Sequence, residues 1–487
     1  MENDLAFADL TALCGMLQRR EVSSVEAVLA CLEQISTHGE RLHAFTEVFF
    51  DDALGQAKNA DQMRDRGENA GPLHGIPIAV KDLLDIAGRV NTGGTACRKD
   101  APPAPHSAPA VAALENAGAI VIGKANLDEL AFGVASQNEH FGFVHNPWGE
   151  NLIPGGSSGG SAVALAAGMA YGALGTDTGG SVRIPASVTA TSALKVTTGL
   201  ISTAGCIAVS GTLDSVGPMA RSVRDLEIML NLLEQTGTLR TKPGKLAGNG
   251  VSGLRLGIEE QHFFNRSRMS ADCQTVMDSV LSDLESVGIE LVPIKLPSIG
   301  YAEAAQKAIV LAEAANYHSG PLRELRPLYG SIIKPNLVLG DAVLAGDYLK
   351  AMDFRFVLAR EFAAAFEYAD FVVTPGVPFA PTSHDVENYV WPDGSSDHIF
   401  DAAWRNFFPT NLVGLPSLAL PCGLSDAGTP IGLQLIAPAL CERDLLTAGT
   451  ALTRKLAWQF RAPGVQGTGA RSHRKEGRAA ERNRKVL

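Results

Sequence analysis

The chain has 487 residues, of which 46% are apolar and 19% charged, and its formal net charge is −11. The ordinary apolar content and the absence of a repeat or heptad exclude collagen-like, disordered and coiled-coil proteins. The acidic balance argues against a general binder of nucleic acid or anionic membranes, because those partners favour a positive face. Glycine is enriched, since 50 of the 487 residues are glycine whereas the usual share is ~7%. The segments that hold the additional glycines are therefore of interest.

The N-terminus, the apolar stretches and the cysteines bear on the cellular compartment of the protein. The N-terminus lacks the charged region and the apolar run of a signal peptide. The most apolar long stretch, residues 162–174, is shorter than the ~20 residues that a membrane span needs. Seven cysteines without a CxxC pair indicate neither a disulfide framework nor a zinc site. We expect a cytoplasmic protein with no nucleic-acid or membrane partner. A homodimer is an alternative to a monomer that the sequence does not decide.

The first seventy residues are predicted to form helices. Ser23 followed by Glu26 is a capping box that opens an apolar-periodic segment. Beyond them, short apolar runs at residues 76–80 and 119–122 are typical of buried strands, and a helix is predicted between them at residues 107–116. This alternation predicts an α/β sheet covered by helices on both faces.

A second cycle of strands and helices follows in the later half of the chain. Helical patterns at residues 301–318 and 341–366 separate several apolar runs. The segment 240–253 is rich in glycine and is predicted to be a joint between two halves. The predicted strands of this half are residues 254–258, 290–294, 371–374, 417–420 and 431–436.

The domain organisation follows from this order of elements. Because strands lie on both sides of the joint, we favour one large domain over two. We expect residues 1–70 to be a helical segment packed on the core and residues 71–460 to complete the same folding unit. Residues 461–487 are expected to be a basic, disordered tail, since residues 471–487 carry seven basic and two acidic side chains.

Much of the glycine excess lies in two segments. Residues 154–161 read PGGSSGGS and precede a small-residue run that we predict to be a helix over residues 162–174. Residues 175–183 read GTDTGGSVR. Successive glycines let the backbone approach another group closely and point its N–H donors inward. These two segments are therefore the candidate chemical centre.

Three interpretations of the first segment compete on its residues alone. A flexible linker would not lead straight into an apolar helix, and a Walker-type phosphate loop needs a lysine that is missing. A nucleophile elbow with Ser158 would have to follow a buried strand, but residues 146–154 are polar and interrupted by proline. The context of the segment therefore favours none of the three.

Together with GIPIAVKD at residues 75–82, the two glycine segments resemble the amidase signature family. The family pattern is a lysine ending a short strand, a GGSSGG loop and a G-[ST]-D-x-G-G-S-[IV]-R segment. Supporting matches lie at residues 123–130, 146–148, 213–218 and 430–436. The likeness covers about residues 5–458. It implies one large α/β domain with a mixed, twisted central β-sheet covered by helices on both faces.

The resemblance implies a Ser-Ser-Lys triad that needs no metal and no organic cofactor. Lys81 would be the base, Ser157 the relay after a cis peptide bond, and Ser181 the nucleophile. Ser158 would be a neighbouring hydrogen-bond donor. The backbone N–H groups expected to form an oxyanion hole belong to Thr178, Gly179, Gly180 and Ser181. The eleven histidines show no metal-ligand spacing.

The chemistry sets a requirement for Lys81. A lysine can act as a base toward a serine only when it is neutral. Because Lys81 follows an apolar run at the end of a predicted buried strand, we expect burial to depress its pKa. The alternative is a lysine paired with Asp82 or another carboxylate. Asp177 and Arg183 are expected to be local scaffold ions rather than substrate ligands.

The chain departs from the family pattern just after the nucleophile. Members commonly read FCGVxGLKPT where this chain reads VTATSALKVT at residues 188–197. Ala190 and Ala193 thus replace glycine, and Val196 replaces proline. None of these is a triad position, so we expect the chemistry to survive and the wall beneath the acyl site to be reshaped.

Substrate specificity is expected in Phe132, Gly133 and Val134, in Ser158, and in parts of residues 301–404. Further pocket candidates are Tyr317, His318, Phe379, Trp391, Trp404 and Phe407, although aromatic residues at helical spacing often belong to the core. A carboxylate-bearing substrate would want a buried arginine. The candidates are Arg323, Arg355 and Arg405.

Two functions follow from the resemblance. The first is an amidohydrolase that cleaves a small aryl, alkyl or carbamoyl-type amide through a serine acyl-enzyme. The alternative is the glutaminase (A) subunit of a tRNA-dependent amidotransferase, which passes ammonia to a partner. LAEAANYH at residues 311–318 resembles small-molecule amidases more than that subunit. A non-enzymatic binding scaffold is a third interpretation, which an intact triad disfavours.

Overall fold

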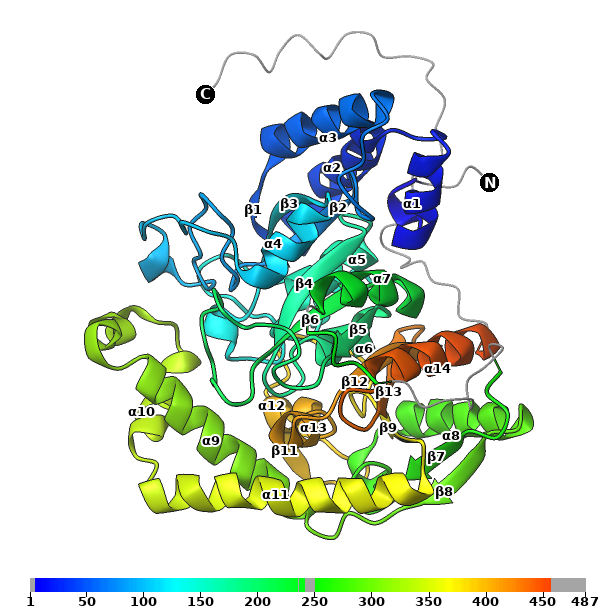
Figure 1. Cartoon of the computed structure of the whole chain (residues 1–487). Coiled ribbons are helices and arrows are strands. Elements are labelled where there is room, and N and C mark those ends of the chain that lie inside the picture. The colour runs from blue at the N-terminus through cyan, green and yellow to red at the C-terminus, as the bar shows by residue number, and fades with distance from the viewer. Residues whose placement is uncertain (1–4, 235, 241–249, 457–487) are drawn as a thin grey trace.

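The computed structural model describes residues 5–234, 236–240 and 250–456. They form a large mixed β-sheet flanked by helices (Figure 1). The helices are α1 (Leu10–Gln18), α2 (Ser24–Leu42), α3 (Phe50–Asp65), α4 (Pro109–Asn116), α5 (Gly159–Ala166), α6 (Arg183–Thr189), α7 (Val223–Leu233), α8 (Ala271–Ser286), α9 (Ala302–Tyr317), α10 (Ile333–Asp341), α11 (Ala345–Tyr368), α12 (Ile399–Trp404), α13 (Phe408–Val413) and α14 (Glu442–Lys455).

The strands are β1 (Phe45–Val48), β2 (Pro77–Lys81), β3 (Ile120–Ala125), β4 (Gly172–Asp177), β5 (Ser192–Lys195), β6 (Ser215–Ala220), β7 (Arg255–Ile258), β8 (Glu290–Pro293), β9 (Phe371–Pro375), β10 (Asn388–Val390), β11 (Ser396–His398), β12 (Ser417–Leu424) and β13 (Pro430–Ile436). Eleven of them form one sheet in the order β1-β3-β2-β4-β6-β5-β12-β13-β9-β7-β8. Strand β2 is parallel to β3 and β4, whereas β4 is antiparallel to β6. The predicted mixed α/β fold is confirmed.

The N-terminal region contains a strand that the sequence prediction missed. The capping box is present as predicted, because the Ser23 side chain accepts the Glu26 N–H and the Glu26 carboxylate accepts the Ser23 N–H. Between α2 and α3, however, β1 pairs antiparallel with β3 at the sheet edge. The interpretation of the first seventy residues as helices alone is therefore wrong at β1, whose four residues are too few for a clear period-2 pattern.

The predicted helix over residues 162–174 is wrong in its second half. Helix α5 ends at Ala166, Gly168 follows with φ +69°, and Gly172 begins β4. Glycine at positive φ ends a helix without steric cost, whereas other residues resist that conformation. Every residue of β4 is buried between its neighbours in the sheet, so the strand shows no alternation that the sequence could display.

The later strands and helices lie close to where they were predicted. Strands β7, β8, β9, β12 and β13 overlap the five predicted runs. The predicted helix at residues 341–366 begins later, because α10 ends at Asp341 and α11 starts at Ala345. Residues 241–249 of the predicted joint and the whole basic tail lie outside the described residues.

Helices α9 to α11 lie at the opposite end of the molecule from α1 to α3 (Figure 1). Helix α9 packs against α10, α11 and α13. Its buried positions are mostly small or apolar, but they include Gln306. Among the described helices, none is long and apolar enough to cross a membrane.

Candidate active site

Lys81 stands at the end of β2, beside the end of β4. Strands β2 and β4 are parallel, with Val80 paired to Leu174. Because parallel strands end at the same edge of a sheet, Lys81 reaches the last residues of β4. Its side chain has an exposed fraction of 0%, so the ammonium is placed where water cannot solvate it.

The Lys81 Nζ contacts three hydroxyl groups. Its distances are 2.8 Å to Ser157 Oγ, 2.9 Å to Ser158 Oγ and 2.9 Å to Thr176 Oγ1. Burial lowers the pKa of Lys81 to about 8, although the negative charge of Asp128 and other nearby groups opposes that shift. The three hydroxyls fit either state of this group: an ammonium donates to all three, whereas a neutral amine donates to two of them and accepts from the third through its lone pair.

Ser158 is held by hydrogen bonds that leave its hydroxyl no free proton. Its Oγ donates to the Thr176 carbonyl (3.2 Å) and accepts from the Thr176 N–H (3.3 Å) and from Lys81. The peptide bond between Gly156 and Ser157 is cis. No strand precedes this loop within the described residues 146–157, apart from an isolated bridge at Leu152. Ser158 therefore lacks both the context and the free hydroxyl of a nucleophile elbow.

Ser181 lies in a turn that a buried ion pair shapes. The Asp177 carboxylate accepts the N–H groups of Gly180 (2.8 Å) and Val182 (3.2 Å) and pairs with Arg183 at 2.8 Å. Arg183 holds the pKa of Asp177 well below its usual range despite complete burial. Asp177 and Arg183 thus have the geometry predicted for scaffold ions. Ser181 itself is 9% exposed.

Among the described residues, three backbone N–H donors around Ser181 have no acceptor. The Gly180 N–H, included in the predicted oxyanion hole, donates instead to Asp177. Gly180 has φ +125°, and a Cβ there would lie 2.7 Å from the Cβ of Phe407. Within the described part of the chain, the N–H groups of Thr178, Gly179 and Ser181 have no hydrogen-bond acceptor. The Ser158 N–H donates to the Ser181 carbonyl (3.0 Å), which holds the two loops together.

A small cavity of about 40 Å³ opens beside Ser181. Its lining residues are Ala131, Phe132, Gly133, Val134, Thr178, Gly179, Ser181, Ile184, Val209, Gln306, Val310, Phe400 and Trp404. Most of these side chains are apolar and none is charged. The wall thus comes from the loop after β3, from the turn that carries Ser181 and the start of α6, from the segment before β6, and from α9 and α12.

Several predicted pocket residues lie away from this cavity. Phe132, Gly133, Val134 and Trp404 line it, whereas Ser158 contacts Lys81 instead. The other aromatic candidates are placed elsewhere: Tyr317 and His318 contact each other, Phe379 and Trp391 pack with Tyr389, and Phe407 lies under Arg183. Of the arginines, Arg323 is exposed, Arg355 donates to the Leu412 carbonyl, and Arg405 donates to the Arg268 carbonyl.

Two buried carboxylates, not singled out by the sequence, support the cavity wall. Asp214 accepts the hydroxyl of Thr178 and the N–H of Val209. Asp128 accepts the Gln137 N–H, and its carboxyl group lies 2.2 Å from where a Cβ on Gly133 would be. Burial raises the pKa of each carboxyl group to about 6. Both aspartates lie in supporting motif matches, which was the available signal.

The residues that replace family glycines and proline lie outside the cavity lining. Ala190 ends α6 with φ +60° and ψ +33°, a conformation that favours glycine. Ala193 and Val196 are buried in and after β5. The expected reshaping of the wall is therefore not found among the residues that line the cavity.

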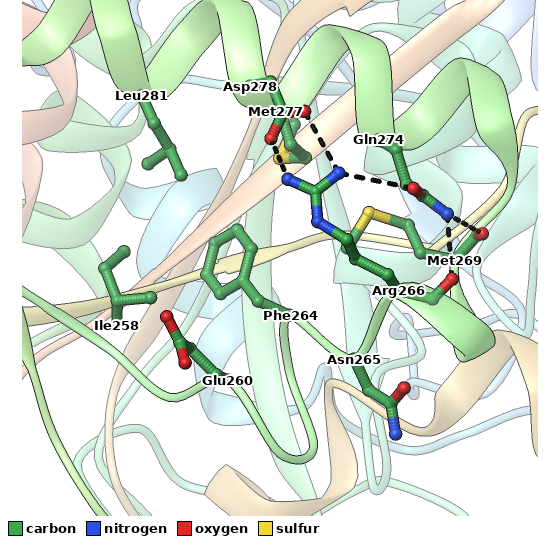
Figure 2. Close-up of a pocket in the computed structure, with 10 residues that line it drawn as sticks. All are labelled: Ile258, Glu260, Phe264, Asn265, Arg266, Met269, Gln274, Met277, Asp278 and Leu281. Atoms are coloured by element: carbon green, nitrogen blue, oxygen red, sulfur yellow. Dashed lines mark hydrogen bonds and ion pairs between the residues drawn. The ribbon is translucent and has the colours of Figure 1, made fainter.

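A larger cavity of about 400 Å³ lies elsewhere, between α8 and the segment after β7 (Figure 2). Arg266 pairs with Asp278 at 2.7 Å, and its other terminal nitrogen also reaches Gln274. Gln274 Nε2 donates to the carbonyls of Arg266 and Met269. This cavity shares no residue with the Lys81 site, and Arg266, Gln274 and Asp278 in its lining are already paired with one another.

Metal ligands are not clustered in the described residues. No group of three or more His, Cys, Asp or Glu side chains is placed there to hold a metal ion.

Comparison with known proteins shows the family of this chain. The family model described as "Amidase" matches residues 26–446. The chain belongs to the amidase family. It is therefore a hydrolase of amide carbon–nitrogen bonds.

This amidase is similar to proteins of two kinds. The A subunit of the glutamyl-tRNA(Gln) amidotransferase from Roseiflexus castenholzii is 35% identical, over 93% of this chain and 97% of the relative. An amidase from Pseudomonas putida is 36% identical, over 94% and 98%. A solved peptide amidase from Stenotrophomonas maltophilia superposes with a TM-score of 0.80 at 28% identity, covering 93% of this chain and 98% of that one.

Proposed function

We propose that this amidase hydrolyses small, neutral amides with a short acyl group, through an acyl-enzyme on Ser181. The observation that carries the proposal is the Ser181 cavity, which is small, mostly apolar and lined by no charged side chain. A charged acyl group would lose its hydration there without gaining a partner. A short alkyl, aryl or carbamoyl group would bury apolar surface instead.

In the proposed reaction, Ser181 Oγ attacks the amide carbonyl. Its proton passes to Ser157, and the Ser157 proton passes to the lone pair of neutral Lys81. Ser158 and Thr176 accept the two N–H groups of that amine, so the lone pair is left for Ser157. The contacts at Lys81 support this division of roles.

The negative charge that develops on the carbonyl oxygen needs donors. We propose the N–H groups of Thr178, Gly179 and Ser181, because Asp177 already binds that of Gly180. The intermediate collapses when the leaving nitrogen takes the proton back through Ser157. Water then hydrolyses the ester on Ser181, with Lys81 again taking a proton.

A second candidate is the glutaminase (A) subunit, which the 35% identical Roseiflexus relative favours. Free glutamine carries an ammonium and a carboxylate at its far end. Neither Arg355 nor Arg405 lines the Ser181 cavity, and Arg323 is exposed. The lining therefore supports a neutral substrate over glutamine.

The test is ammonia release by the purified chain from neutral amides and from glutamine. We expect hydrolysis of simple alkyl or aryl amides by the chain alone, and little hydrolysis of glutamine. Turnover of glutamine alone, and only after a partner protein is added, would support the second candidate and overturn the first.

A further inference from the structure

Helix α9 is joined by two side chains to the structure around Ser181. Gln306 and Glu313 lie seven residues apart, so they project from the same side of the helix about two turns apart. The Gln306 Nε2 donates to the carbonyl of Thr178 at 2.8 Å. Glu313 contacts the segment that leads into β6. One helix therefore holds both the turn that carries Ser181 and the segment next to it.

The Glu313 carboxylate accepts hydrogen bonds from two segments of the chain. Ser210 Oγ donates to it at 2.6 Å, and Thr212 donates both its N–H (3.0 Å) and its hydroxyl (2.8 Å). The hydroxyl of Tyr348 on α11 donates to it at 2.8 Å. Because residues 211–213 form a turn, three hydrogen bonds to one carboxylate hold that turn against α9.

The turn at residues 211–213 leads directly into Asp214, which contacts Thr178. Strand β6 follows Asp214 and pairs antiparallel with β4, which ends just before Thr178. The Asp214 carboxylate therefore lies beside Thr178 and accepts its hydroxyl. It also accepts the N–H of Ser210, whose hydroxyl donates to Glu313. A continuous series of contacts thus connects Glu313 through Asp214 to Thr178.

These contacts fix the peptide unit between Thr178 and Gly179. The unit is trans, and the carbonyl and the N–H of a planar trans unit point in opposite directions. Because Gln306 binds the carbonyl of Thr178, it also sets the direction of the Gly179 N–H. Asp214 holds the side chain of Thr178 at the same unit. The N–H groups of Thr178 and Gly179 are two of the three donors proposed for the oxyanion hole.

We infer that Glu313 is a positioning residue for the oxyanion hole, and this inference rests on the proposed function. By holding the turn at residues 211–213, Glu313 keeps Asp214 against Thr178 and so keeps the Thr178 N–H in place. Glu313 does not line the Ser181 cavity. Stabilisation of a developing oxyanion depends on donors that are in place before the reaction. Loss of this placement should therefore slow the chemical step and leave substrate binding unchanged.

The rate at which a fluorophosphonate labels Ser181 tests the inference without an amide substrate. As Ser181 attacks phosphorus, the phosphoryl oxygen becomes negative and needs the same donors. Glu313→Gln keeps the size of the side chain and loses one acceptor oxygen. We expect the second-order rate constant to fall about tenfold, less than the ~10²–10³-fold cost of losing a whole donor. Labelling of Glu313→Gln at the native rate would overturn the inference.

Tyr348→Phe is the matched control for Glu313→Gln. It removes a donor to the same carboxylate from α11 and leaves the turn at residues 211–213 bound. This variant should be labelled at the native rate. Thr212→Val removes a single hydroxyl from the turn, so it should lower the rate less than Glu313→Gln does and remains informative if that variant does not fold. Equal rates for Tyr348→Phe and Thr212→Val would contradict the inference.

A double-mutant cycle separates positioning from general packing. Thr178→Val removes the hydroxyl that Asp214 accepts and keeps the backbone N–H. If Glu313 acts through Thr178, adding Glu313→Gln to Thr178→Val should lower the labelling rate by less than about twofold. Effects of the two substitutions that multiply independently would contradict the inference.

Amide turnover separates this inference from the proposed function. With a neutral amide, Glu313→Gln should lower kcat about tenfold and keep KM, as expected for an interaction made only in the transition state. The ascending limb near pH 8 should stay in place, because Glu313 does not contact Lys81. A raised KM with kcat kept would contradict the inference. If the native enzyme hydrolysed no neutral amide while the labelling rates followed the expected order, the proposed function alone would be wrong.

Discussion

The catalytic centre and the cavity wall are held in different ways. Around Lys81, the hydroxyls and the ends of β2 and β4 are joined by hydrogen bonds within three motif segments. The opposite wall comes from α9 and α12, whose contacts are mostly apolar and come from distant parts of the chain. In the proposed function, the chemistry is thus specified by short motifs, whereas selectivity depends on how helices from distant parts of the chain pack.

The largest effect is expected from removing the proposed base. Lys81→Met keeps the length of the buried side chain but has no lone pair to accept a proton. Turnover should fall by about 10²–10⁴-fold, as measured by ammonia release, with the circular dichroism spectrum retained. A variant with near-native rates would show that the centre does not work through Lys81.

The pH profile of the native enzyme tests the same residue without a substitution. Because burial lowers the pKa of Lys81 to about 8, the lysine becomes neutral as the pH rises through that value. We expect kcat/KM to rise with pH through about 8. Lys195 is an informative control, since burial lowers its pKa to about 7 but its Nζ donates to the carbonyls of Val196 and Leu415. Lys195→Met should lose stability and keep the ascending limb near pH 8.

Breaking the buried ion pair between Asp177 and Arg183 should lower the free energy of unfolding. Asp177→Asn leaves Arg183 buried without its counter-charge, and breaking such a pair costs about 3–5 kcal/mol. The free energy of unfolding, measured with urea, should fall by that amount. The matched control is Asp278→Asn, which breaks the exposed pair with Arg266 and should cost less than about 1 kcal/mol. Equal losses in the two variants would contradict the scaffold role of Asp177.

A substitution in the cavity wall should change the selectivity between acyl groups of different length. Trp404→Phe removes part of a ring that packs beside Gly179, so longer acyl groups should gain kcat/KM over acetamide by about tenfold. The ascending limb near pH 8 should stay in place, because Trp404 does not contact Lys81. If the ascending limb of the pH profile shifted and the substrate selectivity did not change, the result would contradict the assignment of pH dependence to Lys81 and of selectivity to the cavity wall.

The smallest effect is expected at Ala190. Its φ of +60° suits glycine better than alanine, so Ala190→Gly should raise the free energy of unfolding by about 0.5–1 kcal/mol. The kinetic constants should not change, since Ala190 lies outside the cavity lining. A loss of stability would mean that the methyl group contributes more by packing than its backbone strain costs.

Much of the centre could be predicted from the sequence because its residues lie in contiguous motifs. The structure brings Lys81 to Ser157 as the triad requires, although the roles of these residues stay proposals. The commitment of the Gly180 N–H to Asp177 was missed, since it depends on the geometry of a turn. Strand β4 was partly mistaken for a helix because it is buried on both faces and shows no alternation.

Gln306 could not be found from the sequence. A glutamine on a helix is usually exposed, and only the packing of α9 against the nucleophile turn places this one beside Ser181. Trp404 was named with five other pocket candidates, and the sequence held nothing to separate it from those that belong to the core. Both cases depend on contacts between segments more than a hundred residues apart.

The proposed mechanism depends above all on Ser181, and not Ser158 or Ser157, forming the acyl-enzyme. Treatment with a fluorophosphonate, followed by peptide mapping with mass spectrometry, identifies the serine that reacts. We expect a single adduct on Ser181, which is lost in Ser181→Ala. An adduct on Ser158 that persists in Ser181→Ala would contradict the mechanism.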